Sequence, residues 1–204
     1  MSTSQWLAGE PLVLASRSAV RRAMIEAAGV SLEIAPADID ERAVEARIGS
    51  GTAADAASLL AREKARVGAA RMRGRLVVGA DQTLALGRTR FTKPVDRDSA
   101  REQLRTLSGQ THELHSAVAL ARNGRVLFSK VETARLTMRA LSEEFLDRYL
   151  DTAGEAVMAS VGGYQLEGLG SQLFERIEGD YFTILGLPLF ALLDFLRRDG
   201  CLAR

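Results

Sequence analysis

The chain has 204 residues, 47% of them hydrophobic and 26% charged, a balance typical of a soluble globular domain. Its formal net charge of +1 argues against a nucleic-acid polymer or an acidic membrane surface as partner, so a bound anion needs a local positive cluster. The single cysteine, Cys201, excludes an intrachain disulfide and fits a reducing compartment. Met1–Glu10 lacks signal-peptide features, and the longest apolar stretch, Tyr181–Leu196, is too short to span a membrane. We therefore expect a cytoplasmic protein.

The first half of the sequence predicts strands that alternate with helices. One helix is predicted from an N-cap at Ser18 to Ala28, where Gly29 ends it. The alanine-rich stretch Ala53–Ala70 has apolar residues at helical spacing and predicts a second, longer helix. Three apolar stretches predict short strands, the last of which leads into a turn at Asp81: Leu12–Ala15, Val30–Ala35 and Leu76–Val78.

The second half predicts a hairpin between helices. A helix capped by Asp98 or Ser99 is expected to run to Leu107. The stretch 111–138 is rich in β-forming residues, and Asn123-Gly124 within it predicts a tight hairpin turn. Ser142 and the acids after it resemble a capping box and predict another helix. A glycine-dense stretch, 162–170, follows, and 187–198 predicts a closing helix.

Together these elements predict a mixed α/β fold. We expect a twisted mixed sheet flanked by helices, in one domain over residues 1–204, with two lobes around a deep cleft. The sequence contains no internal repeat, low-complexity tract or linker that would separate independent domains.

An apolar run ends abruptly at Asp81, in the segment Val77–Gln82. Branched residues followed by two small residues and an acid predict a buried strand with one charge at its end. Burying a carboxylate is costly unless something pairs with it, so a carboxylate in this position indicates a functional group. The alternative is an aspartate that caps a turn.

The segment Leu14–Arg22 has the features of a phosphate-binding turn. A strand, a tight turn containing Ser16 and Ser18, and a helix start bearing Arg21 follow one another. Free backbone N–H groups and the positive end of the helix dipole favour an anion, and Ser and Arg side chains add hydrogen bonds. The alternative is an ordinary N-cap serine beside surface arginines. The spacing of a Walker A loop is absent.

A second candidate site combines two acids and two lysines. Two carboxylates are suited to hold a divalent cation, and two ammonium groups are suited to neutralise a polyphosphate. Each residue alone also fits a solvated surface charge, so the site depends on their meeting in space. His112 and His115 lie three apart on a predicted strand and point to opposite faces, so we do not expect them to share a metal. The four charged candidates are Glu41, Lys64, Asp81 and Lys93.

The third candidate is the glycine-rich segment Gly163–Gly170, which carries Glu167 near its middle. Glycines allow a backbone to approach a flat ligand closely. A carboxylate accepts two hydrogen bonds from the edge of a guanine, from its N1–H and its exocyclic amine. A glycine-rich surface loop without a ligand is the equally good alternative.

In order and spacing across nearly the whole chain, these segments resemble the Maf family of nucleoside triphosphate pyrophosphatases. The resemblance implies an α/β fold with a deep cleft, as in inosine triphosphatase-like proteins. It also implies dependence on a divalent cation (Mg²⁺ or Mn²⁺), frequent homodimerisation, and hydrolysis of a nucleoside triphosphate to monophosphate and pyrophosphate. The matching segments are Leu14–Gly29, Asp38–Glu41, Ala61–Ala65, Gly79–Gln82, Lys93-Pro94, Leu107–His112, Phe174–Tyr181 and Gly186–Leu189.

Carried onto this sequence, the resemblance assigns a role to each candidate residue. Asp81 would be the catalytic acid-base group that activates water or its metal, and Glu41 would help Asp81 to hold the metal. Positioning and charge neutralisation provide most of the catalysis in phosphoryl transfer, which suits this set. The residues expected around the triphosphate are Ser16, Ser18, Arg21, Lys64 and Lys93.

Two positions bear on the choice of base. Family members that prefer dTTP and UTP usually have Thr after the catalytic Asp and Gln in the glycine-rich segment, where this chain has Gln82 and Glu167. That pair resembles the subgroup that acts on 7-methyl-GTP, and a carboxylate suits a guanine edge better than a pyrimidine. The subgroup typically has Trp where Val20 stands, so an aromatic that would stack on a cationic base is missing.

We therefore expect a pyrophosphatase that acts on guanine-type or other modified nucleoside triphosphates, as house-cleaning of the nucleotide pool. A pyrophosphatase that prefers dTTP and UTP is one alternative. A second is a protein that regulates cell division by sensing nucleotides without hydrolysing them, and a third is a phosphatase of monophosphates.

Overall fold

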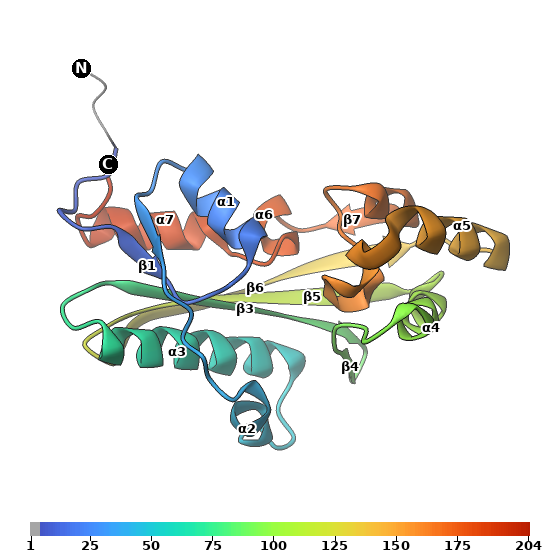
Figure 1. Cartoon of the computed structure of the whole chain (residues 1–204), viewed down its shortest axis with the longest axis horizontal. Helices are drawn as coiled ribbons and strands as arrows, with labels where there is room; N and C mark the ends of the chain where they lie inside the picture. Colours follow the sequence, from blue (N-terminus) through green and yellow to red (C-terminus); the bar gives the residue numbers. More distant parts are fainter. Residues whose placement is uncertain (1–4) are drawn as a thin grey trace. The chain divides into compact units, whose positions relative to one another are not determined.

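The computed structural model describes residues 5–204 as a mixed α/β fold (Figure 1). The first four residues of the Met1–Glu10 segment lie outside the described part. A seven-stranded sheet has the order β2-β1-β3-β5-β6-β7, and β4 pairs with β3. The strands are β1 (Leu12–Leu14), β2 (Leu32–Ile34), β3 (Val77–Leu86), β4 (Thr89–Phe91), β5 (Thr111–Arg122), β6 (Arg125–Met138) and β7 (Phe174–Glu178).

Helices connect these strands and confirm the predicted sheet with flanking helices. No helix within residues 5–204 is long and apolar enough to cross a membrane. The α-helices are α1 (Ala19–Ala27), α2 (Glu41–Ala46), α3 (Ala53–Arg71), α4 (Arg97–Leu107), α5 (Glu143–Ala153), α6 (Tyr181–Ile184) and α7 (Leu189–Arg198). Three short 3₁₀ segments lie at Gly154–Met158, Val161–Gly163 and Leu169–Leu173.

The chain divides into two compact units. The first unit comprises residues 1–82, 116–132 and 186–204, and the second comprises residues 83–115 and 133–185. Strands β3, β5 and β6 each contribute residues to both units. The deep cleft expected between two lobes, like the single-domain assignment, stays a prediction.

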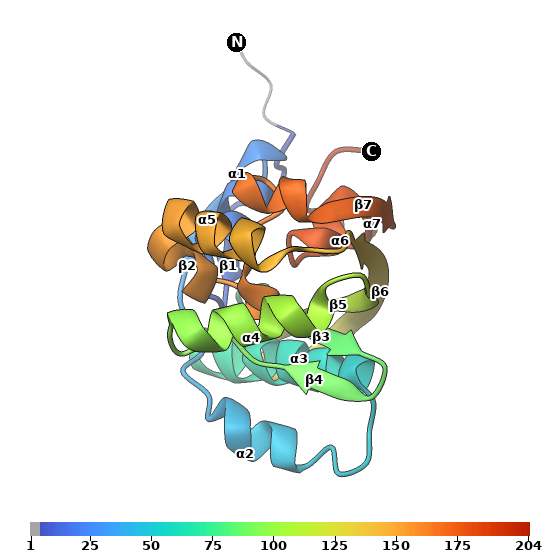
Figure 2. The same ribbon diagram turned by 90° about the vertical axis from the view of Figure 1, so that its right-hand side faces the viewer.

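In the first unit, small side chains allow helix α3 to lie close to the sheet. Strand β1 pairs in parallel with both β2 and β3. Helix α3 runs along one face of these strands, and α1 and α7 lie on the other face (Figure 1). Helix α2 packs on α3, on the side away from α1 (Figure 2). Alanines dominate the core beneath α3, and they include Ala57, Ala61, Ala65, Ala69, Ala117, Ala119 and Ala121.

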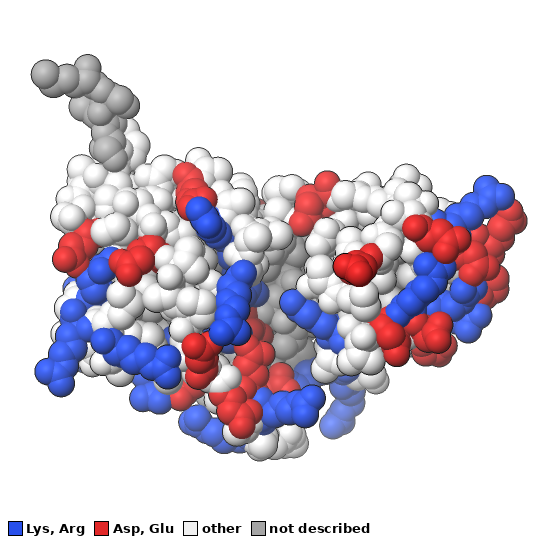
Figure 3. Space-filling model, in the orientation of Figure 1, with Lys and Arg blue, Asp and Glu red and all other residues white. Residues whose placement is uncertain are grey.

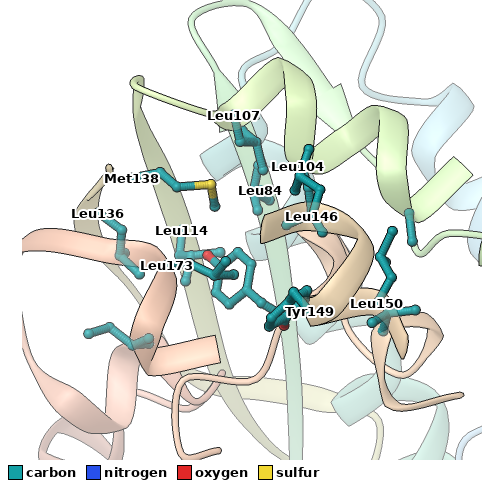
Figure 4. Close-up of a cluster of buried hydrophobic side chains, with 14 of the residues drawn as sticks. Leu84, Leu104, Leu107, Leu114, Leu136, Met138, Leu146, Tyr149, Leu150 and Leu173 are labelled. Atoms are coloured by element: carbon teal, nitrogen blue, oxygen red, sulfur yellow. The ribbon is translucent and has the colours of Figure 1, made fainter. Parts of the chain in front are cut away.

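The second unit has a leucine-rich core of its own, in contrast to the alanine-rich first unit. Side chains from β3, β5, β6, α4 and α5 converge in it (Figure 4). Outside this core, Arg101 and Arg105 of α4 form ion pairs with Glu143 of α5. Figure 3 shows the two signs of charge interleaved over these helices. The labelled core residues are Leu84, Leu104, Leu107, Leu114, Leu136, Met138, Leu146, Tyr149, Leu150 and Leu173.

The hairpin prediction is confirmed. Strands β5 and β6 are neighbours in the sheet, and the turn between them is Asn123-Gly124. Both turn residues have positive φ, 53° and 75°, which is the conformation that a two-residue hairpin turn requires. The bounds of α1, α3 and the short strands lie within a few residues of those predicted.

Three local predictions are wrong in detail. Strand β3 does not end in a turn at Asp81 but continues to Leu86, so Asp81 lies within the strand. The cap of α4 is Asp96, because its carboxylate accepts from the Ser99 backbone N–H while the Ser99 hydroxyl accepts from the Asp96 N–H. Ser142 caps α5, but the third helical residue is Phe145, which cannot return a hydrogen bond, so no capping box forms.

His112 makes the second unit sensitive to acid. Burial lowers the pKa of its imidazole from 6.5 to about 4, because the charged form would lose its hydration. Between pH 6.5 and pH 4 the unfolded chain binds a proton on His112, whereas the folded chain does not. The folded state is therefore most stable, with respect to this residue, above pH 6.5 and loses stability as the pH falls toward 4. We expect the free energy of unfolding to fall by roughly 3 kcal/mol from this residue between these limits.

Denaturant titrations between pH 7 and pH 4 measure this effect. The His112→Gln variant serves as control because its amide does not titrate. The wild type should lose more stability than the variant over this range, by the amount given above. Parallel pH profiles for the two proteins would contradict the assignment.

Candidate functional site

The end of strand β1 and the start of helix α1 form a tight turn that the two serines organise. The Ser18 backbone N–H donates to the Ser16 hydroxyl (3.2 Å), and the Ser18 hydroxyl accepts from the backbone N–H of Arg21 (3.3 Å). Ser16 is buried, whereas Ser18 is half-buried. The N-cap prediction for Ser18 is confirmed. We call residues 15–21 the phosphate turn, because its hydroxyls and helix start have the chemistry that anions require.

Arg21 joins the phosphate turn to two other segments of the first unit. Its Nε–H donates to the Gly186 carbonyl (2.8 Å), and Nη1 donates to the Ala80 carbonyl (2.9 Å) and the Ser16 hydroxyl (3.4 Å). These bonds use three of the five N–H donors of a guanidinium. The two N–H groups on Nη2 have no hydrogen-bond partner within residues 5–204. Arg21 therefore links three segments of the chain, and its two Nη2 N–H groups remain available to donate hydrogen bonds to an anion.

The absence of a side chain at Gly79 places helix α3 against strand β3. A Cβ on Gly79 would lie 2.3 Å from the Ala61 carbonyl oxygen and 2.5 Å from the Ala65 backbone nitrogen. Only glycine permits so close an approach of the strand backbone to the helix backbone. Lys64 precedes Ala65 on this helix and therefore reaches the part of β3 that carries Asp81.

Lys64 links two carboxylates. Its Nζ lies 2.6 Å from Oδ1 of Asp81 and 2.7 Å from Oε1 of Glu41. The Lys64 and Asp81 side chains are each 12% exposed, whereas the Glu41 side chain at the first turn of α2 is 56% exposed. The sequence-predicted residues Glu41, Lys64 and Asp81 therefore form one cluster, and the solvated-surface alternative is wrong for Lys64.

Burial raises the pKa of the Asp81 carboxyl. Desolvation has the larger effect, while the positive charges of Lys64 and Arg21 oppose it. A carboxylate whose ionised form is disfavoured by its surroundings has an increased affinity for a proton. Asp81 therefore combines hydrogen-bond contact with a lysine and the electrostatics of a proton acceptor.

Gln82 follows Asp81 on strand β3 and is half-buried. Its Nε2 donates to the hydroxyl of Ser116 on strand β5 (3.0 Å), and Ser116 is fully buried. Sequence reasoning missed Ser116 and the structural roles of Gly79 and Gly186. A glycine within an apolar strand is a known sign of close backbone approach, so Gly79 had a signal in the sequence. Ser116 had none beyond a hydroxyl in an apolar run.

Two predicted substrate residues, Lys93 and Glu167, belong to the second unit. Lys93 follows strand β4, Glu167 lies in the glycine-rich loop, and both are exposed. Their place beside the substrate stays a prediction. Val20, in the first turn of α1, is half-buried. The two histidines contact different partners, the Tyr164 and Thr133 hydroxyls, and that they share no metal stays a prediction.

The acid pair offers carboxylate oxygens, the kind of donor that binds a divalent cation. Oxygen atoms of Glu41 and Asp81 both lie within 2.7 Å of the Lys64 Nζ, so the two carboxylates converge on one positive charge. No group of three or more His, Cys, Asp or Glu residues suited to a metal occurs within residues 5–204. Magnesium is commonly held by one or two carboxylates together with water and substrate phosphates, and this donor set fits that pattern.

A buried carboxylate with a raised pKa, beside a turn suited to anions on a mixed sheet flanked by helices, fits a phosphoryl-transfer hydrolase. Comparisons with known proteins give a family. Residues 11–199 match the family described as Maf-like protein. The chain belongs to this family.

Relatives of high identity extend over nearly the whole chain. A protein of Rhodopseudomonas palustris (strain BisB18) named nucleoside triphosphate pyrophosphatase is 54% identical over 198 residues, which cover 97% of this chain and 98% of that protein. A protein of Brucella abortus biovar 1 (strain 9-941) named 7-methyl-GTP pyrophosphatase is 50% identical over 193 residues, covering 94% and 97%. A solved nucleoside triphosphatase, the dITP/XTP pyrophosphatase of Mycobacterium abscessus, is 19% identical with a TM-score of 0.44, covering 93% of this chain and 97% of that one.

Proposed function

We propose that this protein is a nucleoside triphosphate pyrophosphatase. The observation that carries the proposal is the cluster of Asp81, Lys64 and Glu41, in which a buried carboxylate with a raised pKa contacts a lysine. The phosphate turn is linked to the same part of β3 through Arg21. Relatives at 54% and 50% identity that carry pyrophosphatase names support the same reaction.

In this reaction water breaks the bond between the α and β phosphates of the substrate. The water oxygen forms a bond to one of these two phosphorus atoms as the bond from that phosphorus to the bridging oxygen breaks. One of the two water protons passes to Asp81, and the products are the nucleoside monophosphate and pyrophosphate. Lys64 and Arg21 neutralise phosphate charge, and the serines of the phosphate turn donate hydrogen bonds to phosphate oxygens. Lys93 is proposed to add a further positive charge. A divalent cation held by Glu41 and Asp81, Mg²⁺ or Mn²⁺, would supply charge neutralisation on the triphosphate.

We propose a guanine-type base as the preferred substrate. Glu167 is exposed and has no hydrogen bond or ion pair with any residue in the part of the chain described, so its carboxylate is available for a base. A guanine offers two adjacent donors to a carboxylate, whereas the matching edge of a pyrimidine has one donor between two acceptors. The Brucella relative named 7-methyl-GTP pyrophosphatase supports this assignment. The half-buried Val20 offers no aromatic ring for stacking on a cationic base.

Measuring pyrophosphate release from 7-methyl-GTP, GTP, dTTP and UTP, with Mg²⁺ or Mn²⁺, tests both parts of the proposal. We expect pyrophosphate rather than orthophosphate, and a kcat/KM for the guanine nucleotides about tenfold or more above that for UTP. Preference for dTTP or UTP would overturn the base assignment alone. Orthophosphate release from monophosphates would indicate a different phosphatase. Binding without turnover of any nucleotide would support a sensing protein.

Removal of unwanted nucleotides from the cellular pool is the physiological role that we propose for this activity. A cytoplasmic location is supported by the one cysteine, which is buried and unpaired. We also propose a homodimer, on the basis of the family resemblance. Size-exclusion chromatography with light scattering measures the oligomeric state directly.

A further inference from the structure

The loop that carries Glu167 is built so that its beginning is buried and its middle is exposed. We call residues 162–170 the tyrosine loop. Gly162 and Gly163 have positive φ values of 81° and 76°, and Tyr164 is only 5% exposed. A Cβ on Gly170 would lie 2.4 Å from the Gln165 carbonyl oxygen, so the loop closes tightly behind Glu167. The exposed carboxylate is therefore attached to a short, constrained segment.

Hydrogen bonds anchor the buried part of the tyrosine loop at three places. The Gly162 N–H donates to Oε1 of Gln103 (3.1 Å), and the Tyr149 hydroxyl donates to the Gly163 carbonyl (3.2 Å). The third bond joins Nε2 of His112 to the Tyr164 hydroxyl (2.7 Å). Tyr164 precedes Glu167 by three residues, and this bond fixes the Tyr164 side chain. The other two bonds fix the backbone earlier in the loop, at Gly162 and Gly163.

The His112–Tyr164 bond is the one hydrogen bond of this imidazole within residues 5–204. Nδ1 of His112 is buried and has no hydrogen-bond partner in the described chain. The bond contains one hydrogen, supplied by the imidazole Nε2–H in one tautomer and by the Tyr164 O–H in the other, and it joins the same two atoms in both. Burial keeps the imidazole neutral, since its pKa is lowered to about 4, and also raises the pKa of Tyr164.

The polar pair of His112 and Tyr164 lies in an apolar environment. The Tyr164 ring packs edge-on against Phe174 with centroids 4.9 Å apart, and His112 lies 5.9 Å from the same ring. Tyr164 belongs to the leucine-rich core. Burying polar groups there costs stability, and the unpaired Nδ1 adds to that cost. What the pair provides in return is a fixed direction for the tyrosine, because a hydrogen bond is directional and apolar packing is not.

We propose that His112 is a positioning residue for base selection: by holding the Tyr164 hydroxyl, it fixes the tyrosine loop so that Glu167 faces the base of the substrate. The inference rests on the proposed function. In addition to Glu167, it makes His112 a determinant of base selectivity, although His112 does not contact the base itself. His112 and the tyrosine loop belong to the second unit, whereas the phosphate turn and the Asp81 cluster belong to the first. We therefore expect a change in base selectivity.

The variant that tests the inference is Tyr164→Phe, which removes the hydroxyl but keeps the ring on Phe174. We expect KM for GTP and 7-methyl-GTP to rise about fivefold, with kcat within about twofold and UTP kinetics unchanged. A Glu167→Gln variant should lose the same selectivity. If Tyr164 acts through Glu167, adding Tyr164→Phe to Glu167→Gln should change selectivity no further.

The matched control is Thr133→Val. It removes the hydroxyl bonded to His115 (2.9 Å), a histidine on the same strand that points to the opposite face, and should leave selectivity unchanged. Additive effects of Tyr164→Phe and Glu167→Gln on selectivity, or an equal effect of Thr133→Val, would overturn the inference. If the wild type releases no pyrophosphate, the proposed function fails instead.

Amide hydrogen exchange tests whether the His112–Tyr164 bond anchors the tyrosine loop, and it does so without depending on enzyme activity. In Tyr164→Phe we expect the amides of residues 165–170 to exchange about tenfold faster than in Thr133→Val, because the nearby anchor is lost. Unchanged exchange would contradict the anchoring whatever the protein hydrolyses. Faster exchange together with unchanged base selectivity in an active enzyme would overturn the link to Glu167.

Discussion

Asp81→Asn is expected to reduce pyrophosphate release by about 10³-fold, because the amide neither accepts a proton from water nor contributes charge to a metal site. Nucleotide binding should remain within about tenfold of the wild type, since the phosphate turn and Lys64 are retained. Steady-state pyrophosphate release and calorimetric titration with GTP measure the two quantities. Retention of more than a tenth of the activity would exclude Asp81 as the proton acceptor.

The same substitution should not destabilise the fold. Asp81 is buried and its pKa is raised, so at neutral pH folding works against the ionised carboxylate. An asparagine of the same shape removes that cost and still accepts a hydrogen bond from Lys64. We therefore expect a Tm equal to or above that of the wild type, as for other functional groups that reduce stability. Asp151→Asn, which removes an exposed partner of Arg97, is the control and should leave activity within about twofold.

A sensing protein and an enzyme differ in this experiment. Both need the phosphate turn, but only the enzyme needs a proton acceptor at position 81. Loss of turnover with retained binding therefore supports catalysis by Asp81. If the wild type and Asp81→Asn bind nucleotide equally and neither releases pyrophosphate, the protein is instead a nucleotide sensor.

Local sequence patterns were sufficient to predict most elements, because their signals are short-range. The hairpin at Asn123-Gly124 and the N-cap at Ser18 depend on residues within one turn, and the structure contains both. The extent of β3 was not predictable in this way. Asp81 and Gln82 resemble a turn in the sequence, but their side chains find partners in Lys64 and Ser116. The strand continues beyond them and pairs with β4 at residues 84–86.

The candidate site could be predicted in part for a similar reason. The phosphate turn is contiguous in sequence, so the sequence alone places Ser16, Ser18 and Arg21 in one group. The contact between Lys64 and Asp81 spans 17 positions and depends on how closely a helix approaches a strand. That distance is set by Gly79 and the alanines of α3. A glycine in an apolar strand indicates a close backbone approach, but it does not indicate which residue of which helix lies opposite.

Among the Gly-to-Ala substitutions in the first unit, Gly79→Ala is accordingly expected to be the most destabilising. The new Cβ would lie 2.3 Å and 2.5 Å from backbone atoms of Ala61 and Ala65, which no side-chain rotation can relieve. Helix α3 must move as a whole, so we expect a loss of about 3 kcal/mol in the free energy of unfolding. Because Lys64 moves with that helix, kcat/KM should fall roughly 10²-fold in the protein that remains folded.

Two other glycine substitutions make a graded control for Gly79→Ala. A Cβ on Gly9 meets nothing within 4 Å, so Gly9→Ala should be neutral in stability and activity. At Gly68, within α3, a Cβ meets the Val77 Cγ1 at 2.9 Å, a side-chain atom that can shift, and the gain in helix propensity of about 1 kcal/mol offsets that clash. Urea denaturation gives the three stabilities. If Gly79→Ala is no less stable than Gly68→Ala, the approach of α3 to β3 does not set the distance between Lys64 and Asp81, and the site must be held by the ion pairs themselves.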